Sequence, residues 1–146
     1  MLRECVSVKP AGIFVNMLFD VETPELTVQS PYPTGLLILT LRPDGLAASA
    51  GKPALWVRVP SWAAGDALRP TDGSGTAVRC EVTSGGAWLF IPDPPVGEPI
   101  SLAVPLASSE LVLQHRTRAI RCALRGDEVA RMEAPAGADL TFFEAF

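Results

Sequence analysis

The stretch Ala54-Leu-Trp-Val-Arg-Val-Pro-Ser-Trp-Ala63 decides the fold class of this chain. Its first six residues predict a β-strand, because successive side chains of a strand point to opposite faces. Three aliphatic side chains occupy one face, and Trp56 and Arg58 occupy the other. Pro60 has no N–H group to donate to a neighbouring strand, so we expect the strand to end there.

Short apolar runs of the same kind fill the rest of the chain, separated by 14 prolines and 12 glycines. No uninterrupted window of a dozen residues carries a helical period. Many short strands with turn residues between them predict an all-β fold, an antiparallel β-sandwich of jelly-roll type with little or no helix. The expected strands are residues 12–19, 25–30, 36–41, 54–59, 77–82, 87–91, 100–104, 111–115, 119–124, 128–132 and 140–143.

The length of 146 residues indicates a single β-sandwich domain, residues 1–146, which is large enough to bury a core. Residues 109–146 are either part of that domain or a separate hairpin layer. Residues 12–19 and 87–91 are apolar on both faces. Such strands lie centrally in a sandwich, or one of their faces meets another domain.

Composition narrows the function classes. The chain is 48% hydrophobic and only 19% charged, which suggests strands buried on both faces or a surface meant for a partner. Its net charge is -4 and its basic residues are scattered, so no nucleic-acid partner is expected. No run approaches the roughly 20 apolar residues of a membrane helix. The three cysteines are far apart, which argues against a zinc site and for reduced thiols in the cytoplasm.

Several segments, taken in order, resemble the region that follows the catalytic barrel in glycoside hydrolase family 127. Gly12-Ile-Phe-Val-Asn-Met-Leu-Phe19 resembles its strand with a Val-Asn pair, and Leu26-Thr-Val-Gln-Ser-Pro-Tyr-Pro-Thr-Gly35 resembles its Tyr-Pro hairpin. Leu55-Trp-Val-Arg-Val-Pro-Ser-Trp-Ala63 is similar to its Arg-Ile-Pro-x-Trp-Ala element, and Leu124-Arg-Gly-Asp-Glu-Val129 to a Trp-Arg-Gly-Asp stretch. The family's Trp-x-x-Gly-Asp turn is missing at Asp93-Pro-Pro-Val-Gly-Glu98, which alters one turn.

The resemblance implies a C-terminal β-sandwich without the catalytic (α/α)6 barrel. In the family, a zinc-bound cysteine nucleophile and acidic residues lie in the barrel, and the matched motifs do not include them. We therefore expect no catalytic residue, no cofactor and no metal site in this chain. The expected function is a non-catalytic accessory domain of a β-L-arabinofuranosidase-like enzyme, which braces or completes a catalytic barrel that is not present in this chain and is a partner domain or subunit.

Five residues are candidates for contact with carbohydrate or with another protein surface: Trp56, Arg58, Trp62, Trp88 and Tyr32. Flat aromatic rings beside a cation suit the stacking of a sugar, whereas the same rings equally suit core or interface packing. Trp62 follows Pro60, so we expect it to tuck beneath the end of the strand. Two alternatives remain open on this basis: a stand-alone carbohydrate-binding module, and a β-sandwich that self-associates.

Other reactive side chains carry little signal. Hydrolysis of a glycoside needs two carboxylates that flank the scissile bond. The acids here lie mostly in expected loops, so we expect them to be solvated. The lone His115 has no acid or cysteine near it in sequence. In Arg125-Gly-Asp127, a turn is a simpler explanation than an adhesion motif. The loop acids are Asp20, Glu22, Glu25, Asp44, Asp66, Asp72, Asp93 and Asp127.

Overall fold

The computed structural model describes residues 5–46, 53–64, 68–115 and 118–132. The chain divides into two compact units, Met1–Pro105 and Leu106–Phe146. Each unit is described by itself below. The sequence predicts one domain over residues 1–146, with residues 109–146 either part of it or a separate hairpin layer. This stays a prediction, which unfolding experiments address.

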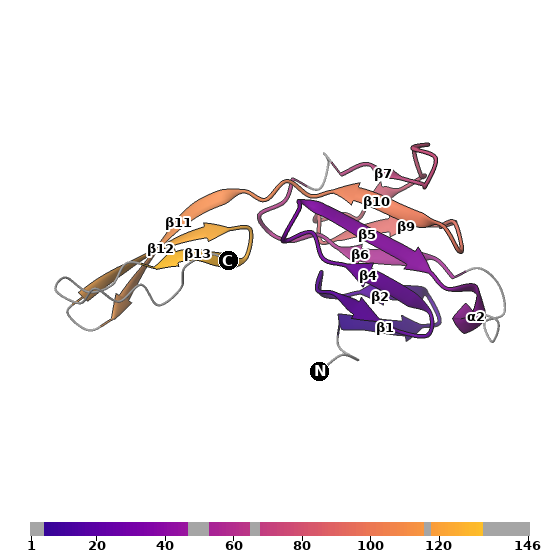
Figure 1. Cartoon of the computed structure of the whole chain (residues 1–146), viewed down its shortest axis with the longest axis horizontal. Coiled ribbons are helices and arrows are strands. Elements are labelled where there is room, and N and C mark those ends of the chain that lie inside the picture. Colours follow the sequence, from indigo (N-terminus) through magenta and orange to yellow (C-terminus); the bar gives the residue numbers. More distant parts are fainter. Residues whose placement is uncertain (1–4, 47–52, 65–67, 116–117, 133–146) are drawn as a thin grey trace. The chain divides into compact units, whose positions relative to one another are not determined.

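The first unit contains two five-stranded sheets (Figure 1). The first sheet has the order β1-β2-β6-β9-β8, with β1 at Val6–Lys9, β2 at Gly12–Val15, β6 at Leu55–Arg58, β9 at Trp88–Ile91 and β8 at Glu81–Val82. The second has the order β3-β4-β5-β10-β7, with β3 at Val21–Glu22, β4 at Leu26–Gln29, β5 at Leu36–Leu41, β10 at Pro99–Ala103 and β7 at Pro70–Thr71.

The two sheets share one hydrophobic core, which makes the unit a sandwich. Alternation along each strand buries one set of side chains, as in β6, where Leu55 and Val57 point inward. Leu89 and Ile91 of β9 belong to the same cluster as Leu39 of β5. Aliphatic residues from both sheets therefore fill the space between them, and the opposite face of each sheet points outward.

One strand pair departs from the expected antiparallel pattern, because β2 and β6 run parallel. The chain passes through β3, β4, β5 and the short helix α2 (Pro43–Leu46) before it returns as β6. Parallel neighbours need such a crossover, whereas a hairpin makes antiparallel ones. Among the described residues, no helix combines the length and the apolar character that crossing a membrane requires.

The second unit is a three-stranded antiparallel sheet formed by β11 (Ser108–His115), β12 (Arg118–Arg125) and β13 (Glu128–Met132). A bulge shifts the register of the last pair between Ala123 and Leu124. The residues Gly126 and Asp127 form the tight turn that joins β12 to β13, with Gly126 at a φ of 62°. The expected turn at Arg125-Gly-Asp127 is therefore confirmed.

The all-β prediction is confirmed, and most expected strands appear with boundaries that differ by four residues or fewer. Strands β2 and β9 are interior strands of their sheet, as their apolar faces predicted. The strand expected over 77–82 is shorter, since only Glu81 and Val82 pair as β8. The strand expected over 140–143 lies outside the described residues.

Candidate functional site

A row of aromatic side chains crosses the outer face of the first sheet. Phe14 of β2 is in register with Trp56 of β6, and Trp56 is in register with Phe90 of β9. All three are partly buried and alternate with inward-facing aliphatic residues. Trp88, two residues before Phe90 on β9, lies on the same side. We call Phe14, Trp56, Trp88 and Phe90 the aromatic face.

The rings of the aromatic face pack on one another. Phe14 and Trp56 are stacked, with ring centroids 5.4 Å apart and an interplanar angle of 2°. On the other side of Trp56, Phe90 lies at 4.3 Å with a tilt of 36°. Trp88 meets Phe14 perpendicularly, with centroids 5.5 Å apart. A phenyl ring from each neighbouring strand thus packs against the Trp56 indole.

Backbone contacts fix the orientation of Trp56. Its Nε1 donates a hydrogen bond of 3.1 Å to the carbonyl oxygen of Ala11, in the turn between β1 and β2. The indole of a tryptophan needs such an acceptor when it is partly desolvated. The bond ties the outer side of β6 to the turn that precedes β2, so the stack is held at a defined angle.

Two cations border the aromatic face. The Lys9 ammonium lies 4.8 Å from the centroid of the Phe14 ring, a cation–π contact. Arg58 is exposed and in register with Trp88. The described residues place no carboxylate within ion-pairing distance of Arg58 and no aromatic ring beneath it.

Three of the five predicted contact residues come together on this face, namely Trp56, Arg58 and Trp88. Trp62 instead packs against the core, and its place beneath the strand end stays a prediction. Its Nε1 is buried and finds no acceptor among the described residues. Tyr32 is 8% exposed and lies against Phe19, with ring centroids 6.0 Å apart.

Sequence reasoning missed two members of the aromatic face, Phe14 and Phe90. Both lie in strands that are apolar on both faces, so alternation alone does not assign them to a side. The only signal was the excess of apolar residues in those strands, which pointed to a contact with another domain.

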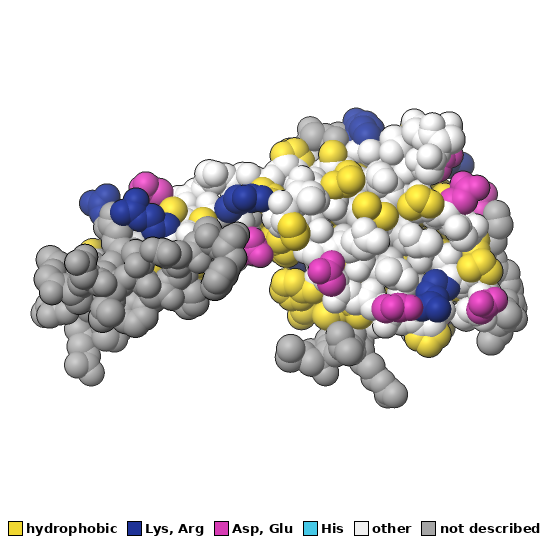
Figure 2. All heavy atoms as spheres, in the orientation of Figure 1, with side chains coloured by type: hydrophobic (Ala, Val, Ile, Leu, Met, Phe, Trp, Pro, Cys, Tyr) yellow, Lys and Arg dark blue, Asp and Glu magenta, His cyan; other side chains and the backbone are white. Residues whose placement is uncertain are grey.

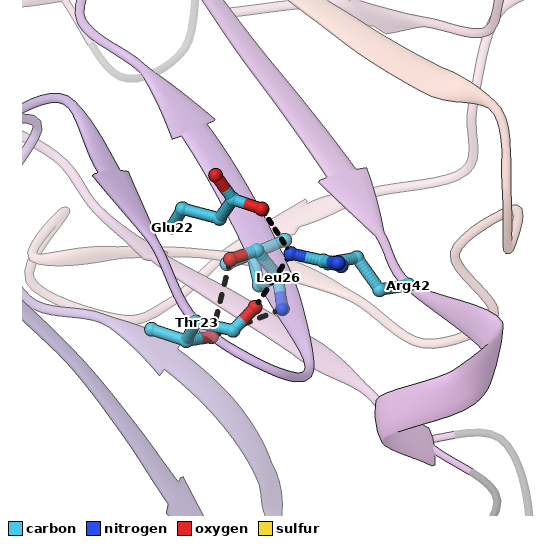
Figure 3. A network of polar contacts seen from close by, with 4 residues as sticks. All are labelled: Glu22, Thr23, Leu26 and Arg42. Atoms are coloured by element: carbon cyan, nitrogen blue, oxygen red, sulfur yellow. Dashed lines mark hydrogen bonds and ion pairs between the residues drawn. The ribbon is translucent and has the colours of Figure 1, made fainter.

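Three of the loop acids, Asp20, Glu22 and Asp72, make local structural contacts. Arg42 bridges Glu22 of β3 to the carbonyl oxygen of Thr23, and the Thr23 hydroxyl both donates to the Leu26 carbonyl (3.1 Å) and accepts from its N–H (3.0 Å) (Figure 3). These contacts close the turn between β3 and β4. A side-chain oxygen of Asp20 accepts a hydrogen bond of 2.6 Å from the backbone N–H of Ser30.

Asp72 organises the loop after β7. Its Oδ1 accepts hydrogen bonds from the Ser74 hydroxyl (2.6 Å), the Thr76 N–H (2.9 Å) and the Ser74 N–H (2.9 Å). These donors, with the Ser74 hydroxyl first, hold the pKa of Asp72 below its ordinary value. The carboxylate thus serves the turn, in the manner of aspartates that bond to the backbone ahead of them.

Ser74→Ala is expected to raise the pKa of Asp72, because it removes the strongest of these donors. With the folded-state pKa below the unfolded one, ionised Asp72 stabilises the fold above the unfolded-state pKa. That contribution is lost as the pH falls through the folded-state pKa. A carboxyl titration followed by NMR measures the shift, with Ser84→Ala as the control. An unchanged midpoint in Ser74→Ala would contradict the assignment.

The other candidates for chemistry are metal-binding groups, the three cysteines, His115 and Asp66. Among the described residues, no group of three or more His, Cys, Asp or Glu side chains is arranged to hold a metal ion. The three cysteines are free thiols. The side chain of His115 and the whole of Asp66 lie outside the described part of the structure.

No protein-family model matches the chain, and no curated protein matches it either. Solved structures do. A structure described as a glycoside hydrolase matches with a TM-score of 0.62 and 19% identity, over 86% of this chain and 22% of that one. A GH127 β-L-arabinofuranosidase from Geobacillus stearothermophilus T6 matches with a TM-score of 0.57 and 22% identity, over 85% of this chain and 20% of that one.

The chain has the fold of a region of glycoside hydrolases, one of them in GH127. At these identities the likeness concerns the fold, and on that level the resemblance read from the sequence is confirmed. The chain spans about a fifth of the length of both matched proteins.

Proposed function

We propose that this chain is a non-catalytic β-sandwich of a glycoside hydrolase related to GH127, and that it braces a catalytic barrel. The observation that carries the proposal is the fold match over 85–86% of this chain and only 20–22% of the matched enzymes. Four-fifths of each matched protein is therefore something other than this sandwich, and the resemblance assigns the barrel to that part.

The proposal includes the parent activity and the setting. The intact enzyme would hydrolyse β-L-arabinofuranosides or a related glycoside, with this chain contributing stability and one border of the cleft. Three free thiols suit a reducing compartment, so we place the protein in the cytoplasm.

The test uses the barrel that the proposal requires the same source to encode. The barrel is produced with and without this chain, and its melting temperature and its turnover of 4-nitrophenyl β-L-arabinofuranoside are measured. We expect no turnover from the chain alone, and a barrel whose melting temperature rises when the chain is added, because a partner that binds only the folded state stabilises it. A barrel that melts and turns over identically in both samples would reject the proposal.

The alternative of a stand-alone carbohydrate-binding module rests on the partly exposed Trp56 and Trp88. Titration of the tryptophan fluorescence with arabinose-containing oligosaccharides separates the two functions. We expect a flat response, because Trp56 and Trp88 both pack against other aromatic rings of the same face. A saturable change would favour the binding module.

A further inference from the structure

We propose that the aromatic face, together with Arg58, is the surface on which the catalytic barrel domain packs. This inference rests on the proposed function and adds which side of the sandwich meets the barrel. It also adds the chemistry of the barrel surface, which is apolar and carries a carboxylate opposite Arg58.

The two outer faces of the sandwich carry different kinds of side chain. On the second sheet, the outward positions hold the hydroxyl residues Thr27, Thr40 and Ser101 together with the aliphatic Leu36 and Ile38, and no aromatic ring lies among them. The first sheet carries the aromatic face in the corresponding place. Figure 2 shows one side of the molecule, on which hydrophobic, acidic and basic side chains are interspersed. A row of four rings differs from that mixture and marks a contact surface.

The contacts between the four rings indicate which kind of partner they fit. A sugar stacks on the flat face of an aromatic ring. In the aromatic face, Phe14 stacks on Trp56, Phe90 lies 4.3 Å from Trp56, and Trp88 stands perpendicular to Phe14. Because the rings pack on one another, less of their flat surface is left for a sugar. Packed, partly buried rings suit the side chains of another protein surface, where aromatic residues contribute much of the contact energy.

The charged residues around the aromatic face indicate the charge of the partner surface. Lys9 and Arg58 border the aromatic face. Glu81, in register with Phe90 at the other end of the row, is paired with Arg79 at 3.4 Å. Among the described residues, Arg58 thus lacks an acid on its own sheet. An arginine beside a desolvated apolar patch is favoured when the partner supplies a carboxylate in a planar, two-pronged contact.

The proposed partner is large. The matched glycoside hydrolases have about four-fifths of their length outside the region that resembles the sandwich. A covalently or stably attached barrel of that size needs a large, partly apolar contact surface. Among the outward surfaces of the described sheets in Met1–Pro105, the aromatic face has that character.

The experiment titrates this chain into the barrel from the same source by isothermal calorimetry. The face variants are Arg58→Glu and Trp88→Ala. The matched controls are Arg121→Glu, the same charge reversal at an exposed site in Leu106–Phe146, and Thr40→Glu, on the outer face of the second sheet. Thermal melts verify that every variant is folded. We expect both face variants to weaken the dissociation constant at least tenfold and both controls to leave it within twofold.

The outcomes separate the inference from the function beneath it. If the wild-type chain binds the barrel but the face variants bind equally well, or Thr40→Glu alone loses binding, the assignment of the face is wrong and the proposed function stands. If the wild-type chain does not bind the barrel, both fail. If light scattering shows self-association that Arg58→Glu abolishes, or an arabino-oligosaccharide binds and Trp88→Ala abolishes it, another occupant holds the face and the inference is overturned.

Discussion

Leu89→Ala is expected to lower the free energy of unfolding of the sandwich by about 2–5 kcal/mol. Leu89 is fully buried on the inner side of β9, between β6 and β8 in the first sheet. Removing three carbon atoms there loses their burial and leaves a cavity that a sheet held by ladder hydrogen bonds cannot close. Urea denaturation followed by circular dichroism measures the loss.

Val82→Ala is the control for this substitution. Val82 is in register with Leu89 on the neighbouring strand β8, yet it is 36% exposed. Its truncation is expected to cost less than about 1 kcal/mol, because an exposed site forms no cavity. Equal losses in the two variants would show that the core does not lie where the sheets place it.

The same denaturation series addresses how the two units unfold. If residues 1–146 behave as one domain, Leu89→Ala shifts a single transition. If Leu106–Phe146 unfolds by itself, a transition that Leu89→Ala leaves in place accompanies the shifted one. The sheet of the second unit carries exposed Leu111 and Leu113, so little of its own apolar surface is buried.

The strands could be predicted from the sequence wherever one face is buried and the other is not. In β6 the alternation of Leu55 and Val57 with Trp56 and Arg58 gave both the strand and the side on which its tryptophan lies. In β2 and β9 both faces are apolar, so period 2 vanishes from the sequence. Phe14 and Phe90 could be assigned to the aromatic face only once the register with Trp56 was known.

Three short strands were missed for a different reason. Strands β3 and β7 have two residues each, and β7 begins with a proline. Such segments carry no period of their own, and they are strands because a longer neighbour supplies their hydrogen-bond partners. The sequence of strand β1 is partly polar, with Ser7 and Lys9 on the outer side. It forms a strand because it pairs with β2.

Gly12→Ala is expected to destabilise the sandwich by about 3 kcal/mol or more, from backbone strain and overpacking together. Gly12 has a φ of 132°, which residues with a Cβ rarely adopt. A Cβ at this position would lie 2.2 Å from the carbonyl oxygen of Ala54. That oxygen accepts the 2.9 Å hydrogen bond from Ile13 which begins the parallel pairing of β2 with β6. Thermal unfolding followed by circular dichroism measures the effect.

Gly75→Ala separates the two causes. Gly75 has a φ of 84°, and a Cβ there would meet no atom within 4 Å, so its replacement is expected to cost only the strain, about 1–2 kcal/mol. The excess loss in Gly12→Ala then belongs to the contact between β2 and β6. The carbonyl oxygen of Ala11, the residue before Gly12, accepts the hydrogen bond of the Trp56 indole. Gly12→Ala is therefore expected to shift the tryptophan emission, whereas Gly75→Ala is not. Equal losses and equal spectra would mean that the strand pair on which the aromatic face is built tolerates displacement.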